Sequence, residues 1–175
     1  MRKLKNNELG RINIEEFKCA TKTPITIILD NVRSAINVGS IFRTSDAFLI
    51  ENIILCGITA TPPDKEILKA ALGATDSVKW DFSENTIDAV KKLKAEGYHI
   101  IGIEQTDKST MLNDINLPKK PIAIIMGNEV NGVAQEVIDV CNTVIEIPQF
   151  GTKHSLNISV STGIVIWELW RKLNA

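Results

Sequence analysis

The sequence predicts an α/β fold with a mostly parallel six-stranded sheet flanked by helices. Apolar runs of strand length alternate with segments of helical period along the chain. The runs are nearly continuous in Ile and Val, which is typical of strands buried on both faces. The predicted strands are residues 25–29, 52–56, 77–82, 99–103, 122–126 and 143–147. The predicted helices are residues 37–49, 64–72, 84–96, 131–140 and 156–172.

Capping and stop signals support the individual helices. Ser83 is placed to cap the third predicted helix, and Gly97 follows that helix as a stop. Its apolar face consists of Ile87, Val90 and Leu93. No internal repeat, low-complexity tract or linker interrupts the alternation, so we expect one α/β domain over residues 23–175, preceded by a short polar arm over residues 1–22.

Composition excludes several classes of protein. The chain has 175 residues, of which 44% are hydrophobic and 23% charged, as in an ordinary globular protein. No apolar run approaches the roughly 18–20 residues that span a bilayer, and the N-terminal stretch has no apolar core of a secretory signal. The three isolated cysteines argue against a disulfide framework or a Cys-based zinc site. We therefore expect a cytoplasmic protein with no membrane contact and no metal.

The stretch LDNVRSAINVGSIFRTSDAF, residues 29–48, places polar residues at the join between a strand and a helix. Asn37 is a plausible N-cap, and Gly39 in the first turn would allow a ligand to approach free backbone N–H groups. Arg43 lies one turn further along, where a cation suits a phosphate or carboxylate. A capped helix with a solvated arginine explains the same residues equally well.

Two more strands end in unusual polar segments. IAIIMGNEVNGV, residues 122–133, matches neither a dinucleotide-binding fingerprint nor a P-loop. Taken alone, it is better explained as a turn in which Glu129 caps the next helix. In the C-terminal segment IEIPQFGTKHSLNISVSTG, residues 148–155 lack any periodicity, as functional loops often do. Ser155 is placed to cap the helix that follows.

Together, the three segments closely resemble the three motifs of the SpoU (TrmH-like) RNA methyltransferases of the SPOUT superfamily. The first motif, N-x-G-x-x-x-R-T, is matched by Asn37, Gly39, Arg43 and Thr44. The second, G-x-E-x-x-G, is matched by Gly127, Glu129 and Gly132. The third is matched by Ile147, Pro148, Gly151, Ser155, Leu156, Asn157, Ser159 and Val160. The motifs occur in the family's order, and the resemblance covers roughly residues 23–173.

The resemblance implies methyl transfer from S-adenosylmethionine to a ribose 2′-hydroxyl in RNA, by a homodimer with a deep C-terminal trefoil knot. Carried over by position, the catalytic residues are Arg43, Asn37, Glu129, Ser155 and Asn157. The cofactor contacts are Ile103, Glu104, Gly127, Ile147 and Leu156. Because a guanidinium stays protonated, we expect Arg43 to act as a cation rather than as the general base often assigned to it.

The RNA substrate and the dimer also have local signals. Arg33, Arg11 and Lys153 are candidate phosphate contacts, and the short flanking segments favour tRNA over rRNA by analogy with smaller family members. The last predicted helix is apolar on most sides, which fits either a dimer interface or full burial within one subunit. Two alternatives to an RNA methyltransferase are a non-catalytic RNA-binding or assembly factor and an α/β enzyme that binds a small nucleotide or anion.

Overall fold

A seven-stranded parallel sheet forms the centre of the protein. The structure, a computed structural model, describes all 175 residues. The strands are β1 (Thr23–Asp30), β2 (Ile50–Cys56), β3 (Trp80–Ser83), β4 (His99–Ile103), β5 (Thr110–Met111), β6 (Ile122–Met126) and β7 (Thr143–Glu146), in the order β3-β2-β1-β6-β4-β7-β5. Every paired strand is parallel to its neighbour, so all carboxyl ends lie on one edge of the sheet.

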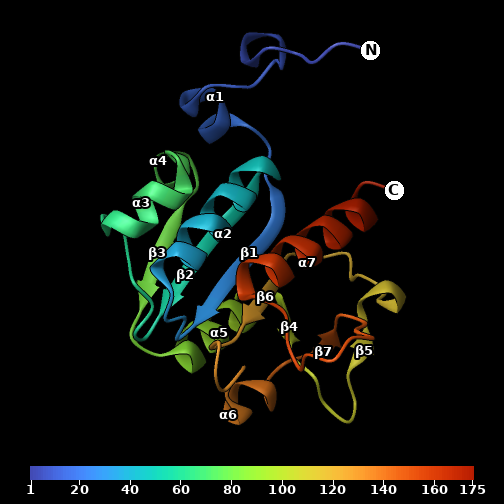
Figure 1. Ribbon diagram of the computed structural model, residues 1–175. Coiled ribbons are helices and arrows are strands. Elements are labelled where there is room, and N and C mark those ends of the chain that lie inside the picture. Colours follow the sequence, from blue (N-terminus) through green and yellow to red (C-terminus); the bar gives the residue numbers. More distant parts are fainter.

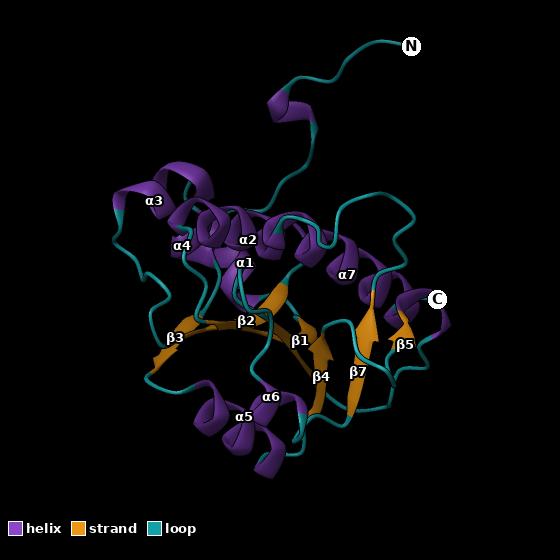
Figure 2. Ribbon diagram, turned by 60° about the horizontal axis from the view of Figure 1, so that its bottom comes forward, coloured by secondary structure: helices purple, strands orange, loops and turns teal.

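Helices cover both faces of the sheet, as Figures 1 and 2 show. One layer contains α1 (Ile14–Cys19), α2 (Ala35–Ala47), α3 (Lys65–Ala71), α4 (Ala74–Ser77) and α7 (Ile158–Leu173). The other layer contains α5 (Thr86–Ala95) and α6 (Gln135–Ile138). Two short 3-10 turns span Asn6–Glu8 and Leu112–Asp114. None of the helices is long and apolar enough to span a bilayer.

The central strands are buried on both faces, as the sequence predicts. On β1, Ile27 and Leu29 join the larger apolar cluster, which includes residues of α2, α3 and α7, while Ile28 joins the smaller cluster under α5 and α6. The same division holds on β6, where Ile124 and Ile125 belong to different clusters. A parallel sheet with helices on both sides requires apolar residues at successive positions, which explains the continuous Ile and Val runs.

The predicted sheet is confirmed in type, but it has one strand more than expected. The additional strand, β5, has two residues at the edge of the sheet and pairs only with β7. Two residues cannot display a hydrophobic period, so the sequence carries no signal for it. The third predicted strand, 77–82, is instead Trp80–Ser83, because Ser77 ends α4. The knot implied by the resemblance stays a prediction.

Helix starts differ from the predicted ones because other residues cap them. Helix α2 begins at Ala35 with Ser34 as its N-cap, so the prediction that Asn37 caps it is wrong. Helix α7 is capped by Asn157 rather than by Ser155. The N-cap position of α5 is occupied by Asn85 instead of Ser83, without a side-chain cap. The fourth predicted helix, 131–140, is reduced to the four residues of α6, because a turn occupies its first part.

Gly39 has a packing role rather than the predicted role at a ligand. It is buried where α2 crosses α3, and a Cβ placed on it would lie 2.4 Å from the Ile67 carbonyl oxygen and 2.7 Å from the Ala70 Cβ. Its small size therefore allows the two helices to approach closely. The sequence alone cannot show which side of α2 faces a neighbouring helix.

Candidate methyl-transfer site

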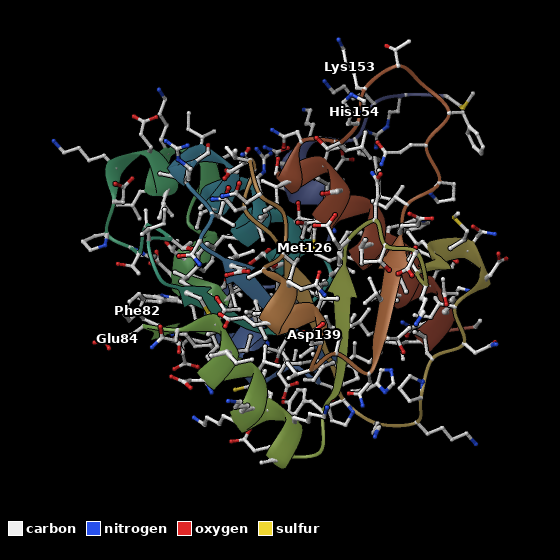
Figure 3. The ribbon with its side chains drawn as sticks, turned by 90° about the horizontal axis from the view of Figure 1, so that it is seen from below. Phe82, Glu84, Met126, Asp139, Lys153 and His154 are labelled. Atoms are coloured by element: carbon white, nitrogen blue, oxygen red, sulfur yellow. The ribbon has the colours of Figure 1, made fainter.

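A large pocket lies at the carboxyl edge of the sheet, beyond β4, β6 and β7. Its volume is about 700 Å³, and it is bounded by Ile103 at the end of β4, Met126 at the end of β6 and Glu146 at the end of β7. The first residues of α7 close another side. Met126 is seen from this edge in Figure 3, with Lys153 and His154 on the loop that precedes α7. In α/β sheets, this edge is where ligands bind.

A chain of side-chain hydrogen bonds connects all three sequence motifs at the pocket. The amide of Asn37 donates to Glu129 Oε1 over 3.4 Å, and the amide of Asn157 donates to Asn37 Oδ1 over 3.2 Å. The side-chain oxygen of Asn157, Oδ1, accepts hydrogen bonds from the backbone N–H of Ser159 at 2.9 Å and of Val160 at 3.4 Å. The start of α2, the turn after β6 and the start of α7 are thereby held together.

Glu129 fixes the start of α2 from another part of the chain. Its Oε2 accepts from the Arg33 N–H at 2.9 Å, and its Oε1 accepts from the Ser34 N–H at 3.1 Å. Burial alone would raise the pKa of Glu129, but the hydrogen bonds from Arg33, its own N–H, Ser34 and Asn37 outweigh burial and lower the pKa below its ordinary value. Glu129 is therefore an ionised carboxylate that caps a helix N-terminus, though a different helix from the one its sequence position suggested.

The turn after β6 is rigidly built and is part of the pocket wall. Asn128 and Gly132 exchange two backbone hydrogen bonds of 3.0 and 2.9 Å. The side chain of Asn128 donates to the Asn31 carbonyl at 2.6 Å and accepts from Val130 N at 2.8 Å. A Cβ on Gly127 would lie 2.2 Å from the backbone carbon of Gly132, so no larger residue fits there without movement of the backbone.

Glu104, the residue directly after β4, supports the same turn. Its Oε2 accepts from the Val133 N–H at 3.0 Å, and its Oε1 accepts from the Gln105 N–H at 2.8 Å. A Cβ on Gly132 would lie 2.0 Å from Glu104 Oε2, and Gly132 has a positive φ of 66°. Both features require glycine at this position.

The structure brings most of the predicted site residues together. The lining of the pocket includes all five predicted cofactor residues and three of the predicted catalytic residues: Ile103, Glu104, Gly127, Ile147, Leu156, Glu129, Ser155 and Asn157. Asn37 is not part of the lining, but it is hydrogen-bonded to Glu129 and Asn157, which are. Arg43 is exposed on α2, outside the lining. Among the predicted catalytic residues, only Arg43 and Ser155 have side chains without a hydrogen-bond partner.

The three predicted RNA contacts lie in different places. Arg33 is exposed next to Glu129, and its backbone N–H is the group that Glu129 binds. Lys153 lines a smaller pocket of about 210 Å³ beside the large one. Arg11 belongs to the N-terminal segment, which projects from the body beyond the amino end of β1 (Figure 1). Because the large pocket lies at the carboxyl edge, Arg11 is remote from the pocket within one chain.

Sequence reasoning missed a buried carboxylate that supports the site. Asp30 at the end of β1 is buried, and its Oδ1 accepts hydrogen bonds from Thr86 at 2.5 Å and Asn31 at 2.8 Å. Its Oδ2 accepts from the Ala134 N–H at 3.3 Å. Asp30 thereby connects β1 to the starts of α5 and α6. A charged residue at the end of an otherwise apolar strand was the available signal.

Neither a metal centre nor a reactive thiol accompanies the pocket. No group of three or more His, Cys, Asp or Glu side chains is arranged to hold a metal ion. Burial raises the pKa of the Cys56 thiol to about 12, even though the hydrogen bond with Thr86 lowers it. Burial likewise raises the pKa of Cys141 to about 11. Both thiols are therefore protonated at neutral pH and are weak nucleophiles.

Comparison with protein families matches residues 24–167 to the model of the SpoU rRNA Methylase family. The chain belongs to the SpoU family. It is 32% identical over 152 residues to the 23S rRNA (guanosine-2′-O-)-methyltransferase RlmB of Neisseria meningitidis serogroup B, covering 87% of this chain and 60% of that protein. It is 31% identical over 170 residues to RlmB of Shewanella oneidensis, covering 94% of this chain and 66% of that protein.

Solved structures of SpoU-family proteins have the same fold. An AdoMet-bound rRNA methyltransferase from Sinorhizobium meliloti superimposes with a TM-score of 0.81 at 30% identity, covering 90% of this chain and 60% of that one. The A. aeolicus TrmH/SpoU tRNA modifying enzyme has a TM-score of 0.82 at 24% identity, with 92% and 82% covered, which supports the fold alone. The chain spans about three fifths of the length of the curated relatives that head the comparison.

Proposed function

We propose that this SpoU-family protein transfers a methyl group from S-adenosylmethionine to a ribose 2′-hydroxyl in RNA. The observation that carries the proposal is the meeting of all three motif segments at one pocket, where hydrogen bonds join Glu129, Asn37 and Asn157. One relative is named as a 23S rRNA (guanosine-2′-O-)-methyltransferase, and one structural neighbour is described as AdoMet-bound.

The pocket fits this cofactor in size and charge. Its volume of about 700 Å³ lies within the usual range for small-molecule sites. The charged residues in its lining are Glu104, Glu129 and Glu146, and no Lys or Arg lines it. A site of this charge suits a cationic sulfonium ligand and disfavours polyphosphates such as NAD or ATP. This argues against the alternative of a nucleotide- or anion-binding enzyme.

We assign the cofactor to Ile103, Glu104, Gly127, Ile147 and Leu156. The turn after β6 and the backbone of Ile147 and Leu156, which line the pocket, are the groups that we expect to meet the adenosine and amino acid moieties. When bound, the sulfonium supplies an activated methyl group. The protein's own task is then to orient the ribose and to stabilise charge that develops on its hydroxyl oxygen.

The hydrogen bonds divide the predicted catalytic residues into two groups. Asn37, Glu129 and Asn157 have their polar groups engaged with one another and with helix N-termini, so they position the site. Arg43 and Ser155 have unengaged side chains and are the residues we assign to the RNA. Arg43 places a fixed positive charge near the phosphate and the developing alkoxide, and Ser155 offers a hydroxyl to the ribose.

We further propose a homodimer through α2 and α7. Val160, Ile164 and Trp167 are 52%, 38% and 51% exposed on α7, and Ile36 is 54% exposed on α2. Arg43 lies seven residues after Ile36, on the same side of α2. Covering this face with a second copy would bring Arg43 into an interface beside the pocket. Sedimentation of the protein at micromolar concentration tests the dimer, and a monomer would contradict it.

Methyl incorporation from labelled S-adenosylmethionine into RNA tests the activity. Label in alkali-resistant dinucleotides identifies the ribose 2′-oxygen as the acceptor. Separate tRNA and rRNA substrates test the sequence-based preference for tRNA, since named relatives include rRNA enzymes. Binding of S-adenosylhomocysteine, seen as a rise in Tm that NAD and ATP do not produce, tests the pocket independently. A rise in Tm without any transfer would favour the non-catalytic RNA-binding factor.

The role of Arg43 is tested with a pair of substitutions at saturating RNA. A cationic role predicts that Arg43→Lys retains more activity than Arg43→Ala, with the alanine variant reduced at least about a hundredfold in kcat. Equal loss in both variants would contradict a simple charge and would favour a role specific to the guanidinium group.

A further inference from the structure

Phe150 is an aromatic side chain that the protein leaves in solvent beside the site. It is 96% exposed, whereas the other exposed aromatic residues, Phe82 and Trp167, are about half covered. Phe150 lies in a segment, residues 148–157, in which every residue is exposed. Single exposed apolar residues are common on proteins, so the position of Phe150 must carry the argument.

The segment around Phe150 borders both pockets. Gln149 lines the large pocket and the smaller one, and His154 does the same. Gly151 and Lys153 line the smaller pocket, while Ser155 lines the large one. Phe150 therefore extends from the rim of the site, five residues before the hydroxyl that we assign to the ribose. In Figure 3, Lys153 and His154 mark this rim, on the opposite side of the molecule from Phe82.

The segment is held loosely enough to adapt to a partner. No backbone–backbone hydrogen bond involves residues 148–156. A single side-chain bond ties it to the body, from Gln105 Nε2 to the His154 carbonyl oxygen at 2.8 Å. Phe150 and Lys153 thus present an aromatic ring and a cation on the same loosely held loop.

We propose that Phe150 stacks on an unpaired nucleobase next to the methylated ribose, with Lys153 on the adjoining phosphate. This rests on the proposed function. Proteins recognise single-stranded RNA by stacking splayed bases on aromatic side chains and by placing cations on the backbone. The residues that follow Phe150, from Gly151 to Ser155, include no apolar side chain. The core of a protein–protein interface would require contiguous apolar surface, so a base fits this ring better than a protein partner.

Kinetics with the RNA substrate test the proposal through a difference between two Michaelis constants. For Phe150→Ala we expect the KM for RNA to rise about tenfold while the KM for S-adenosylmethionine stays unchanged, as loss of one stacked base predicts. Phe150→Tyr should retain the wild-type value, and Phe150→Leu should resemble alanine because it lacks a π-face. Phe82→Ala is the matched control, since it truncates an exposed aromatic residue remote from the site, and it should leave both constants unchanged.

A titration with a single-stranded oligonucleotide that contains 2-aminopurine tests stacking without turnover. Wild-type protein should change the fluorescence of the base on binding, and Phe150→Leu should not. Lys153→Gln should reduce the slope of log affinity against log salt by about 0.7, as expected for one lost contact to single-stranded RNA. Rescue by leucine, or an unchanged KM and fluorescence in Phe150→Ala, would overturn the proposal. If wild-type protein transfers no methyl group, the proposed function fails, and the oligonucleotide titration still decides the stacking.

Discussion

The pocket has two walls of opposite construction. The turn of residues 127–133 is held by backbone hydrogen bonds across it, by the Asn128 side chain inside it, and by Glu104, which directly follows β4. The segment of residues 148–157 is exposed throughout, and Gln105 supplies the one hydrogen bond that ties its residues 148–156 to the body. Both walls belong to motifs of the same family, yet one is preorganised and the other is adaptable.

The difference corresponds to the two ligands that we assign to the site. A small cofactor of constant shape is bound best by groups that are already in place, since ordering them on binding reduces affinity. A folded RNA brings a nucleotide that must leave its stack, and an adaptable loop can follow it. We therefore propose that the rigid wall holds the cofactor, and that the adaptable wall contacts the RNA except at Leu156, which we assign to the cofactor.

The largest contrast is expected between two glycines, one in each wall. Gly127→Ala would place a Cβ 2.2 Å from the Gly132 backbone, whereas Gly151→Ala has no atom within 4 Å of the new Cβ. We expect the first substitution to lower the free energy of unfolding by about 3 kcal/mol and to abolish S-adenosylhomocysteine binding. The second should stay within about 0.5 kcal/mol of wild type. Denaturant unfolding and ligand titration measure both, and equal effects would remove the distinction between the walls.

A smaller effect is expected from Asp30, which supports the rigid wall from within the sheet. Asp30→Asn retains the shape but replaces one accepting oxygen with a donor that faces Thr86 and Asn31 or Ala134. The loss of a satisfied buried acceptor should destabilise the protein by about 2 kcal/mol. Asp107→Asn, in the loop after β4, is a surface control with no hydrogen bond to its side chain. Unchanged stability of Asp30→Asn in urea would contradict the supporting role.

Glu129 should give an effect that depends on pH. Its pKa is lower in the folded protein than its ordinary value of 4.5, so its contribution to stability is present above that value and is lost as the pH falls through the folded-state pKa. We expect Glu129→Gln to lower the free energy of unfolding by about 1 kcal/mol at neutral pH, as for loss of a helix cap. The difference from wild type should shrink at acid pH. Glu136→Gln, an exposed residue without a hydrogen bond, should show no such trend.

Hydrogen exchange should distinguish the walls without any substitution. The amides of Gly132, Val133 and Ser34 donate to carbonyl or carboxylate oxygens, so we expect them to exchange slowly. The amides of residues 150–155 have no acceptor and should exchange within the shortest labelling time. Binding of S-adenosylhomocysteine should protect the first group further. Comparable exchange in both segments would show that the loop is more ordered than its hydrogen bonds suggest.

Sequence reasoning predicted which residues lie close together better than it predicted where helices start. The motif residues Gly127, Glu129, Ser155 and Asn157 converge on one pocket as expected. The N-caps Ser34 and Asn157 were misassigned by two or three positions, because several capping residue types occur close together and the choice among them depends on contacts across the fold. The role of Asn37 changed for the same reason, from a cap of its own helix to a bond between two other segments.

The sequence by itself determined the α/β class, the parallel sheet and the motif residues of the family. These follow from local patterns, since hydrophobic period and short spacings can be read along the chain. Only the tertiary structure decided which groups remain free at the pocket. Glu129 is hydrogen-bonded to the start of α2, and Gly39 packs against α3. The side chains of Arg43 and Ser155 have no hydrogen-bond partner. Such assignments depend on partners that are distant in sequence, so no local pattern contains them.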